Sequence, residues 1–530
     1  MANERVIKIH AVEKEYSQAR AFVEEFLDAR RVKAINASET VSLFEALFHT
    51  IILQVGNEET ELAIKGVGHL GHTDIDIAFP GERFSLPEGE ASSDSYVETI
   101  ETLSDKMSSS YEAGYNIIRI SAKKSAWAPI LPSIIAIVAA VIVSIVLGFA
   151  LNDAERQMVA NEWIAPLQKL FTNAMLMIGA PMTLFSLLKN VTDAFIVADA
   201  HSSTRKLFVA SVASSLGTIV IALIMGFAFA QSALSAFGVA ERVDIGFANW
   251  TLASAIDHII PSSIVQPFET ISPVPMIVVA LLIAGALRSI GKNFNLIKRA
   301  IDACYDLFSG ILQIVMTVFP IACFLLFLQI LLLEGGSEQF AEIFFVAALV
   351  FACTLPLLVV YGLGLKARGI HMREFVRKLL PLLKENFAIG SVIDAVPFNT
   401  RYCEKNFGIS RDRLEKELPI LSQTSLDGNC YILMLLATIY IFLANCEVSW
   451  FNIAVIALIV MFLSFGAPNQ PGSILIGMLV ILTYLNSDTI VALALCFELF
   501  FGGLQNMLNV ISSVVTVAEN EASEANRDSR

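Results

Sequence analysis

A single carboxylate, Asp427, stands inside the long apolar run of residues 420–444 and is followed at once by Gly428 and Asn429. A carboxylate at the centre of a membrane helix costs roughly 2.5–3.5 kcal/mol on insertion scales, so it normally has a partner or binds an ion. A glycine beside it lets the helix unwind and expose carbonyl oxygens that can ligate a cation. This pattern favours a cation site, and a structural acid that caps an unwound helix is the alternative.

Two further hydrophobic segments, residues 375–402 and 450–485, are each interrupted in the middle by glycine, proline and polar residues. Each begins and ends beside loops of the same side, so each must enter and leave the membrane by one face. We predict re-entrant hairpins of opposite entry, which form an inverted repeat and bind solute where their tips meet. The tip residues that are candidates for solute contact are Ser391, Asp394, Pro468 and Asn469. For Asp394, a local helix-capping role is an equal alternative.

Amide side chains mark the last apolar segment, residues 489–517. Gln505 and Asn509 are four residues apart and share one face of a helix, and Asn506 lies beside them. Amides in membranes commonly hydrogen-bond between helices, but we prefer contact with a solute for this face. Glu498, earlier in the same segment, fits either a contact with the rest of the fold or a proton-carrying role.

The composition is that of a polytopic membrane protein. The chain has 530 residues, of which 55% are hydrophobic and 16% charged, and its mean hydropathy is +0.65. The formal net charge of −14 argues against a nucleic-acid partner. The seven cysteines stand singly, without a CxxC pair or a His/Cys cluster, so neither a zinc site nor a disulfide framework is indicated.

The apolar segments divide the chain into a soluble α/β domain (1–125), a membrane domain (126–517) and an acidic tail (518–530). Basic residues gather in alternate loops, which places both the N- and the C-terminus on the cytoplasmic side of the cell membrane. The membrane domain is expected to be mainly α-helical and surrounded by lipid, with eight spans plus the two hairpins. The eight spans are residues 128–151, 163–188, 206–237, 247–286, 301–333, 340–364, 420–444 and 489–517.

The order of elements in residues 1–125 resembles the ATP-binding fold of anti-sigma-factor kinases and histidine kinases. Strands are expected at 5–12, 61–66, 73–79 and 116–122, and helices at 14–30 and 38–54. In that family a Glu precedes a magnesium-binding Asn by four residues; here Glu45 is present, but His49 stands in the Asn position. Only Gly81 remains of the adenine-binding turn. We therefore expect no ATP binding and a regulatory domain, for which a cytosolic protein is the candidate partner.

Four motifs of the membrane domain resemble the sodium-coupled glutamate/aspartate and dicarboxylate symporters over residues 128–517. They are SLDGN (425–429), SFGAPNQPGS (464–473), NFGIS (406–410) and the segment 505–510. The resemblance implies a homotrimer that is coupled to Na⁺, with a proton as the alternative ion. It also implies an elevator motion, in which the hairpins, the central helix and the last helix carry the solute across.

Several positions match the site residues of that family. Asp427 matches the sodium-ligating Asp, and Asn509 matches the Asn that binds the main carboxylate of the substrate. The implied metal ligands are Asp427, Ser425, Ser214, Ser215, Asn509 and Ser513. The implied solute contacts are Asn429, Gly502, Gln505, Asn506 and Asn509, together with the tip residues.

Other positions depart from the family. Gly502 stands where an Asp holds the amino group of the substrate, and Gln505 where an Arg holds a side-chain carboxylate. Ser513 replaces an Asp of a second sodium site. Loss of the Arg removes a bidentate clamp for a second carboxylate. We therefore expect a solute with a single carboxylate and fewer coupled sodium ions.

Cation-coupled secondary transport of a small organic solute, such as a carboxylate or an amino acid, is the leading hypothesis. The alternative is a sensor that keeps the transporter fold and signals through residues 1–125, because fold alone does not imply transport. An enzyme is not expected, since the one candidate, an ATP-dependent kinase domain, lacks the Asn at position 49.

Overall fold

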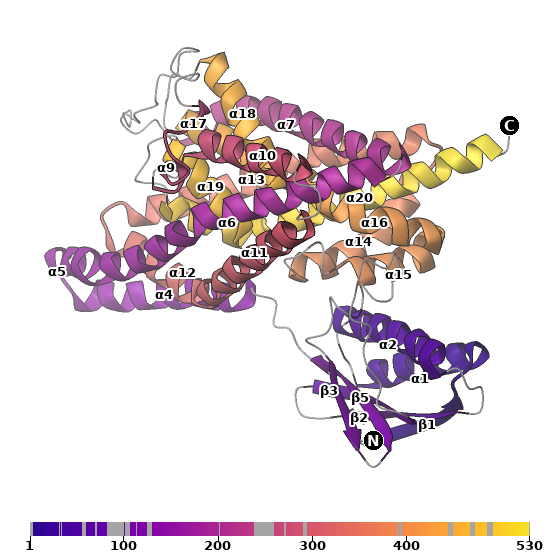
Figure 1. Cartoon of the computed structure of the whole chain (residues 1–530). Coiled ribbons are helices and arrows are strands. Elements are labelled where there is room, and N and C mark those ends of the chain that lie inside the picture. Colours follow the sequence, from indigo (N-terminus) through magenta and orange to yellow (C-terminus); the bar gives the residue numbers. More distant parts are fainter. Residues whose placement is uncertain are drawn as a thin grey trace. The chain divides into compact units, whose positions relative to one another are not determined.

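The computed structural model forms two compact units (Figure 1). The first comprises Met1–Trp127 and Pro397–Tyr402, and the second comprises Ala128–Val396 and Cys403–Arg530. The structure describes residues 4–528 except 31, 33, 56–59, 69–71, 82–99, 101–106, 113, 124–129, 201, 238–258, 270–271, 290–293, 390–391, 393–394, 444–448, 467–471 and 485–490.

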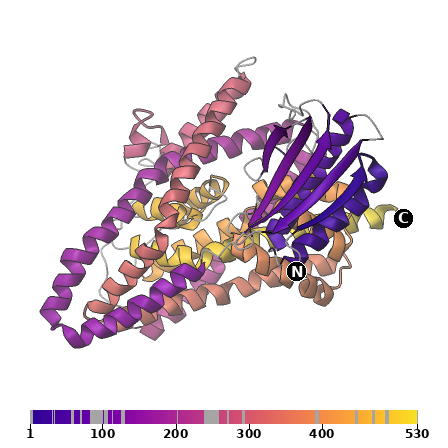
Figure 2. The same ribbon diagram turned by 90° about the horizontal axis from the view of Figure 1, so that it is seen from below.

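The first unit contains a five-stranded antiparallel sheet with strand order β1-β2-β3-β5-β4 (Figure 2). Its elements are β1 (Glu4–His10), η1 (Glu13–Glu15), α1 (Tyr16–Ala29), α2 (Ala34–Val55), β2 (Glu61–Gly68), β3 (His72–Pro80), β4 (Met107–Glu112) and β5 (Tyr115–Lys123). The residue pattern predicts both helices and every strand except β4. The sequence of β4, MSSSYE, lacks the alternate apolar residues by which a half-buried strand is recognised.

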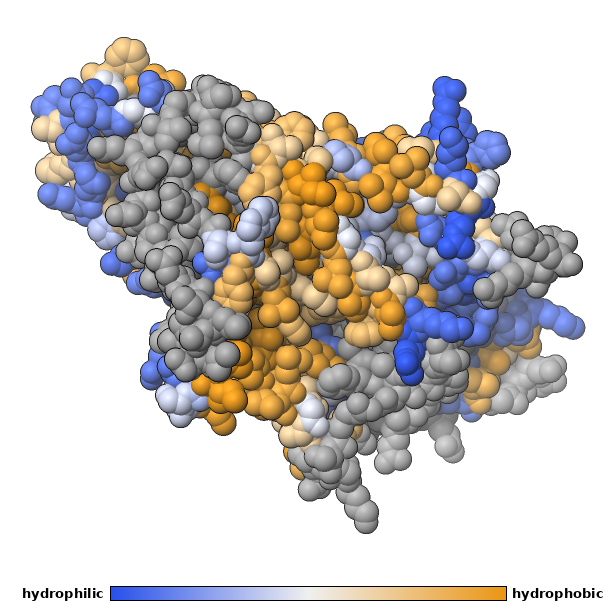
Figure 3. All heavy atoms as spheres, turned by 90° about the horizontal axis from the view of Figure 1, so that it is seen from above, coloured by the Kyte–Doolittle hydropathy of each residue, from blue (hydrophilic) through white to orange (hydrophobic). Residues whose placement is uncertain are grey.

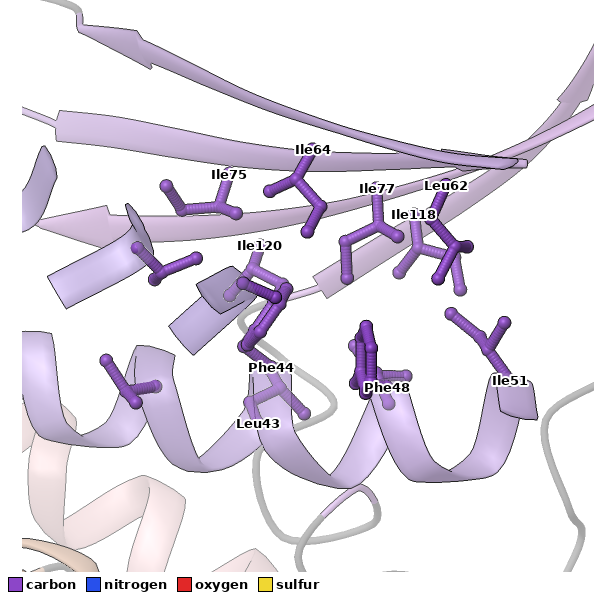
Figure 4. Close-up of a cluster of buried hydrophobic side chains, with 14 of the residues drawn as sticks. Leu43, Phe44, Phe48, Ile51, Leu62, Ile64, Ile75, Ile77, Ile118 and Ile120 are labelled. Atoms are coloured by element: carbon purple, nitrogen blue, oxygen red, sulfur yellow. The ribbon is translucent and has the colours of Figure 1, made fainter. Parts of the chain in front are cut away.

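Alternation along the strands gives this sheet one apolar face. Ile75 and Ile77 of β3 point toward α2, where Phe44 and Phe48 are fully buried (Figure 4). Asp76, between the two isoleucines, lies on the other face and accepts two hydrogen bonds from Arg119, at 2.7 and 3.0 Å. Full burial of such an apolar side chain contributes about 1.5–3 kcal/mol, so the helices are held on the sheet mainly by this layer.

The second unit is helical. Its elements are α4 (Ile130–Ala150), α5 (Asp153–Met158), η3 (Val159–Ile164), α6 (Ala165–Ala200), α7 (Ser202–Phe237), α9 (Gln266–Glu269), α10 (Pro273–Ser289), α11 (Phe294–Thr317), α12 (Phe319–Leu332), α13 (Gly336–Ala367), α14 (Met372–Ile389), α15 (Val396–Phe407), α16 (Arg411–Thr424), α17 (Asp427–Leu443), α18 (Trp450–Phe465), α19 (Ser473–Tyr484) and α20 (Val491–Asp528). Within the described ranges, seven helical segments are long and apolar enough to cross a membrane.

Apolar side chains cover much of the outside of this unit. Hydrophobic residues spread over the middle of the face in Figure 3, and hydrophilic residues gather toward its ends. Large apolar side chains such as Ile142 of α4, Val220 of α7 and Val359 of α13 are exposed, which fits a lipid-facing surface. The predicted fold class, a mainly α-helical polytopic membrane protein with an N-terminal α/β domain, is confirmed.

Residues 301–333, expected as one span, form two helices instead. α11 ends at Thr317 and α12 begins at Phe319. Pro320 lies in the first turn of α12. A proline has no backbone N–H, which is tolerated in the first turn of a helix but interrupts a helix that runs through it. The chain therefore breaks at Val318, and α12 packs against α4.

The central helix is also broken, and the break differs from the expectation. α16 ends at Thr424 and α17 begins at Asp427, so the backbone leaves the helix at Ser425 (φ −88°, ψ 80°) and not at Gly428. Gly428 is helical, and a Cβ there would lie 2.2 Å from the carbonyl oxygen of Gln505. This glycine therefore serves the close approach of α17 to α20.

The two predicted hairpins correspond to the helix pairs α14/α15 and α18/α19. The tip residues Ser391, Asp394, Pro468 and Asn469 lie outside the described residues, so their solute contacts stay predictions. The acidic segment that starts at residue 518 continues α20 to Asp528. It is tied to α16 by Arg413, whose Nε lies 2.5 Å from a carboxylate oxygen of Glu521.

Candidate functional site

The start of α17 places Asp427 in the interior of the second unit. Asp427 is the first residue of the helix and is 0% exposed. A carboxylate in the first turn is stabilised by the positive end of the helix dipole. Broken helices in the interior of membrane proteins are typical of ion and solute sites.

Hydroxyl groups surround this carboxylate. Ser215 donates a hydrogen bond to Asp427 Oδ1 at 2.9 Å. Three hydroxyls donate to Oδ2: those of Ser214 at 2.6 Å, Tyr361 at 2.7 Å and Ser512 at 2.7 Å. In the part of the chain that the structure describes, no Lys, Arg or His forms an ion pair with Asp427.

This donor set fits a small hard cation. Carboxylate and hydroxyl oxygens are hard ligands, and a hydroxyl that donates to the carboxylate can rotate to present a lone pair instead. Within the described ranges there is no cluster of three His, Cys, Asp or Glu side chains, and the charge of this site comes from Asp427. A monovalent ion would leave such a site neutral.

The predicted metal ligands are only partly brought together. Ser214, Ser215 and Asp427 meet directly, and Ser425 joins them through Ser512, with 2.5 Å between the two hydroxyl oxygens. Ser513 donates to the carbonyl oxygen of Asn509 on its own helix. The residue patterns did not predict Tyr361 or Ser512. A Tyr inside the apolar run of α13 is the available signal, because a buried phenol normally needs a partner.

Beside the carboxylate lies a network of amides. Asn509 Oδ1 accepts hydrogen bonds from the backbone N–H groups of Gly428, at 2.7 Å, and Asn429, at 3.4 Å. The other end of this amide, Nδ2, donates to Asn429 Oδ1 at 2.8 Å. Asn429 Nδ2 is consequently left buried without a hydrogen-bond partner among the described residues.

Gln505, one turn before Asn509 on α20, has an acceptor without a partner among the described residues, where Asn429 has a donor. Its Nε2 donates to the hydroxyl of Ser473 at 2.8 Å, while its Oε1 is buried and has no partner in the part of the chain that the structure describes. A buried polar atom without a partner costs about 1–3 kcal/mol, and such atoms are rare in folded proteins. A free donor on Asn429 and a free acceptor on Gln505 therefore point to a ligand. Asn506, also buried, lies about 100° around the helix from Gln505.

Gly502 and Glu498 lie farther along the same helix. Glu498 is buried and accepts backbone hydrogen bonds from Gly472 and Leu475 at the start of α19. A Cβ at Gly502 would lie 2.9 Å from Glu498 Oε1. The sequence leaves two roles open for Glu498, a contact with the rest of the fold and the carrying of a proton. The structure contains such a contact.

In the first unit, the residues that resemble a nucleotide site have other partners. Glu45 Oε2 lies 3.4 Å from Arg401 Nη2, and both side chains are largely buried. His49 Nδ1 lies 3.2 Å from Glu13 Oε2, and its ring stacks at a tilt on Tyr16. Phe79, two residues before Gly81, is part of the hydrophobic core.

Comparison with known proteins agrees with this geometry. Residues 133–519 match the model of the sodium:dicarboxylate symporter family. The "C4-dicarboxylate transport protein" of Rhodopseudomonas palustris (strain BisB18) is 26% identical over 388 residues, which cover 71% of this chain and 85% of that protein. "C4-dicarboxylate transport protein 1" of Bradyrhizobium diazoefficiens is 26% identical over 391 residues, which cover 70% and 86%.

A more distant relative, the "C4-dicarboxylate transport protein" of Edwardsiella ictaluri, is 22% identical over 270 residues, covering 50% of this chain and 62% of that protein. The resemblance that the motifs indicate in the membrane domain is thereby confirmed. Since the family model matches well over half of the sequence, the chain is a multi-pass membrane protein that belongs to the sodium:dicarboxylate symporter family.

Proposed function

We propose that this protein carries a small organic solute with one carboxylate across the cell membrane, coupled to a cation that binds at Asp427. One observation carries the proposal: the buried carboxylate of Asp427, whose partners among the described residues are hydroxyl groups, stands two residues from Asn429, whose amide has a donor without a partner among those residues. The relatives are named as transport proteins for C4-dicarboxylates, which supports a carboxylate as the cargo.

Na⁺ is the coupling ion that the donor set favours. Asp427 carries the one negative charge, and the hydroxyls of Ser214, Ser215, Tyr361 and Ser512 are neutral oxygen ligands within reach. A proton on Asp427 is the alternative, because a protonated carboxyl would still hydrogen-bond to hydroxyls. Sodium should stabilise the protein at constant pH, whereas proton coupling should leave it insensitive to sodium.

The solute is recognised by the two free amide groups. Asn429 Nδ2 would donate to a carboxylate oxygen, and Gln505 Oε1 would accept a hydrogen bond from an O–H or N–H group of the same solute. Both atoms are buried, and within the described ranges neither has a hydrogen-bond partner. An acceptor in place of an Arg makes a second carboxylate unfavourable at Gln505. An amino acid or a hydroxy acid with one carboxylate fits this pair.

The remaining expectations are part of the same proposal. The helix pairs α14/α15 and α18/α19 would act as re-entrant hairpins in an elevator motion within a homotrimer, with both termini cytoplasmic. The first unit would regulate transport without ATP, because Glu45 and His49 are engaged by Arg401 and Glu13. A cytosolic protein is its candidate partner, and neither unit would act as an enzyme.

Thermal unfolding of the purified protein against a panel of amino acids and mono- and dicarboxylates, each with and without Na⁺, tests the proposal. A ligand present at 100 times its dissociation constant stabilises the folded state by about 2.7 kcal/mol. We expect one solute class to do so only when Na⁺ is present, and reconstituted vesicles to accumulate that solute under a sodium gradient. Absence of any binding or accumulation would contradict the proposal.

A solute sensor is the second candidate, and one feature favours it. Residues Pro397–Tyr402 of α15, in the first predicted hairpin, belong to the same compact unit as the N-terminal domain, and Arg401 pairs there with Glu45. Deletion of residues 1–125 separates the two functions. A transporter keeps uptake, whereas a sensor shows none before or after the deletion.

A further inference from the structure

The helix α19 begins with a ready-made site for an anion. Gly472 precedes the helix at φ +101°, and its carbonyl accepts the N–H of Ile476 at 3.0 Å, so Gly472 is the N-cap residue. Helix N-termini bind anions because their first N–H groups lack partners within the helix and the dipole is positive there. A glycine has no side chain with which to cap these groups.

Glu498 of α20 fills this position with its own carboxylate. Oε1 accepts the N–H of Gly472 at 2.7 Å, and Oε2 accepts the N–H of Leu475 at 3.0 Å. Both carboxylate oxygens of Glu498 therefore accept hydrogen bonds from the start of α19. Gly502 makes the arrangement sterically possible, since a Cβ there would lie 2.9 Å from Glu498 Oε1.

The occupied anion site lies next to the free amide groups. Ser473, the first residue of α19, receives the hydrogen bond of Gln505, and Gln505 lies one turn of α20 from Asn509. A solute whose carboxylate is held by Asn429 would thus extend past Gln505 toward the start of α19. At that end it meets the acceptor oxygen of Gln505 and then the negative charge of Glu498.

We propose that Glu498 is a specificity-determining residue, whose carboxylate takes the place of a second solute carboxylate at the start of α19. It thereby restricts the site to solutes with a single carboxylate and a hydrogen-bond donor at the other end. This inference rests on the proposed function and names its substrate class. A like charge at that end excludes dicarboxylates, and the acceptor on Gln505 favours a hydroxyl or an ammonium group.

The test compares binding of 4-hydroxybutyrate and succinate, which share a four-carbon chain and differ in one end group. Titration of the full-length protein with each compound, in the presence of Na⁺, gives the ratio of the two dissociation constants. We expect the native protein to prefer 4-hydroxybutyrate, and Glu498→Ala to shift the ratio toward succinate by about tenfold or more. Glu498→Asp, which keeps the charge, should preserve the native preference. Glu524→Gln, which changes a carboxylate at the far end of α20, should leave the ratio unchanged.

Gly502→Ala provides a second variant in case Glu498→Ala does not accumulate as folded protein. The added Cβ displaces the Glu498 carboxylate without removing its charge, so a smaller shift toward succinate is expected. A native preference for succinate, or a ratio that neither variant alters, would overturn the inference while leaving carboxylate transport intact. If the native protein binds no mono- or dicarboxylate of the wider panel, the proposed function itself fails.

Discussion

Asn509 Nδ2 donates a hydrogen bond of 2.8 Å to Asn429 Oδ1, across the contact between α20 and α17. The other end of the Asn509 amide accepts the backbone N–H of Gly428 at 2.7 Å. Because that N–H requires an oxygen, the orientation of Asn509 is fixed, and the orientation of Asn429 follows from it. The Nδ2 of Asn429 is thus held in one orientation without a solute, which would lower the entropic cost of the binding proposed for it.

Asn509→Asp tests this arrangement. The aspartate keeps an oxygen for the N–H of Gly428 but offers no donor to Asn429, and it brings a negative charge to the site. Asn429 would then turn its Nδ2 toward the new carboxylate. We expect carboxylate affinity to fall by more than about tenfold, measured by calorimetric titration. The control is Asn520→Asp on the same helix, where Asn520 donates to Glu417; an equal loss of affinity there would contradict the role of Asn509.

Asp427→Asn should abolish the response to Na⁺. The amide keeps the shape of the side chain but removes the one charge that the hydroxyl groups surround. We expect the stabilisation by saturating Na⁺, about 2.7 kcal/mol at 100 times the dissociation constant, to disappear in thermal unfolding. Asp193→Asn is the matched control, because Asp193 lies away from this site and forms an ion pair with Lys298, with 2.9 Å between the charged atoms. Persistence of the full sodium effect in Asp427→Asn would place the ion elsewhere.

Tyr361→Phe and Tyr431→Phe form a second matched pair. Each removes one buried hydroxyl, but Tyr361 donates to the carboxylate of Asp427, whereas Tyr431 donates to the neutral carbonyl of Cys353. Hydrogen bonds to charged groups contribute about 1.5–3 kcal/mol and neutral ones about 1 kcal/mol. We therefore expect the larger loss in unfolding free energy from Tyr361→Phe, together with a weaker response to Na⁺. Denaturant titration in detergent measures the first effect, and a reversed order would argue against a charged Asp427.

The sequence predicts the acid of this site better than its surroundings. Asp427 is recognisable because a carboxylate within an apolar run is costly, and Ser214 and Ser215 follow from the family resemblance. Tyr361 and Ser512 come from other helices, and their approach depends on how α13 and α20 pack on α17, which no local pattern encodes. Strand β4 is missed for a related reason: its serines carry no periodic signal, and it forms because Gly114 (φ +84°) turns the chain onto β5.

Glu498 is a residue that the sequence identifies as unusual but whose contacts it does not predict. Its position in an apolar helix marks it as unusual, but two roles fit the sequence equally well. Only the packing of α19 against α20 brings the N–H groups of Gly472 and Leu475 to its carboxylate. The hydrogen bonds of Glu498 are thus determined by the packing of two helices and not by its neighbours in the sequence.

Gly428→Ala should separate the two helices that carry the site. The added Cβ would lie 2.2 Å from the carbonyl oxygen of Gln505 and 2.9 Å from Asn509 Oδ1. The first of these atoms belongs to the backbone, so the clash is relieved only if α17 and α20 move apart. Overpacking of this kind costs about 1–3 kcal/mol, and the movement would also lengthen the hydrogen bond between Gly428 and Asn509.

We therefore expect Gly428→Ala to lower both the unfolding free energy and the affinity for carboxylates. Gly310→Ala in α11 is the control, because nothing lies within 4 Å of a Cβ there, and replacing a helical Gly with Ala stabilises by about 0.5–1 kcal/mol. Opposite signs of the two stability changes would support close packing at Gly428. If Gly428→Ala were as stable as the native protein and bound solute equally well, the short distance between α17 and α20 could not be a requirement of the site.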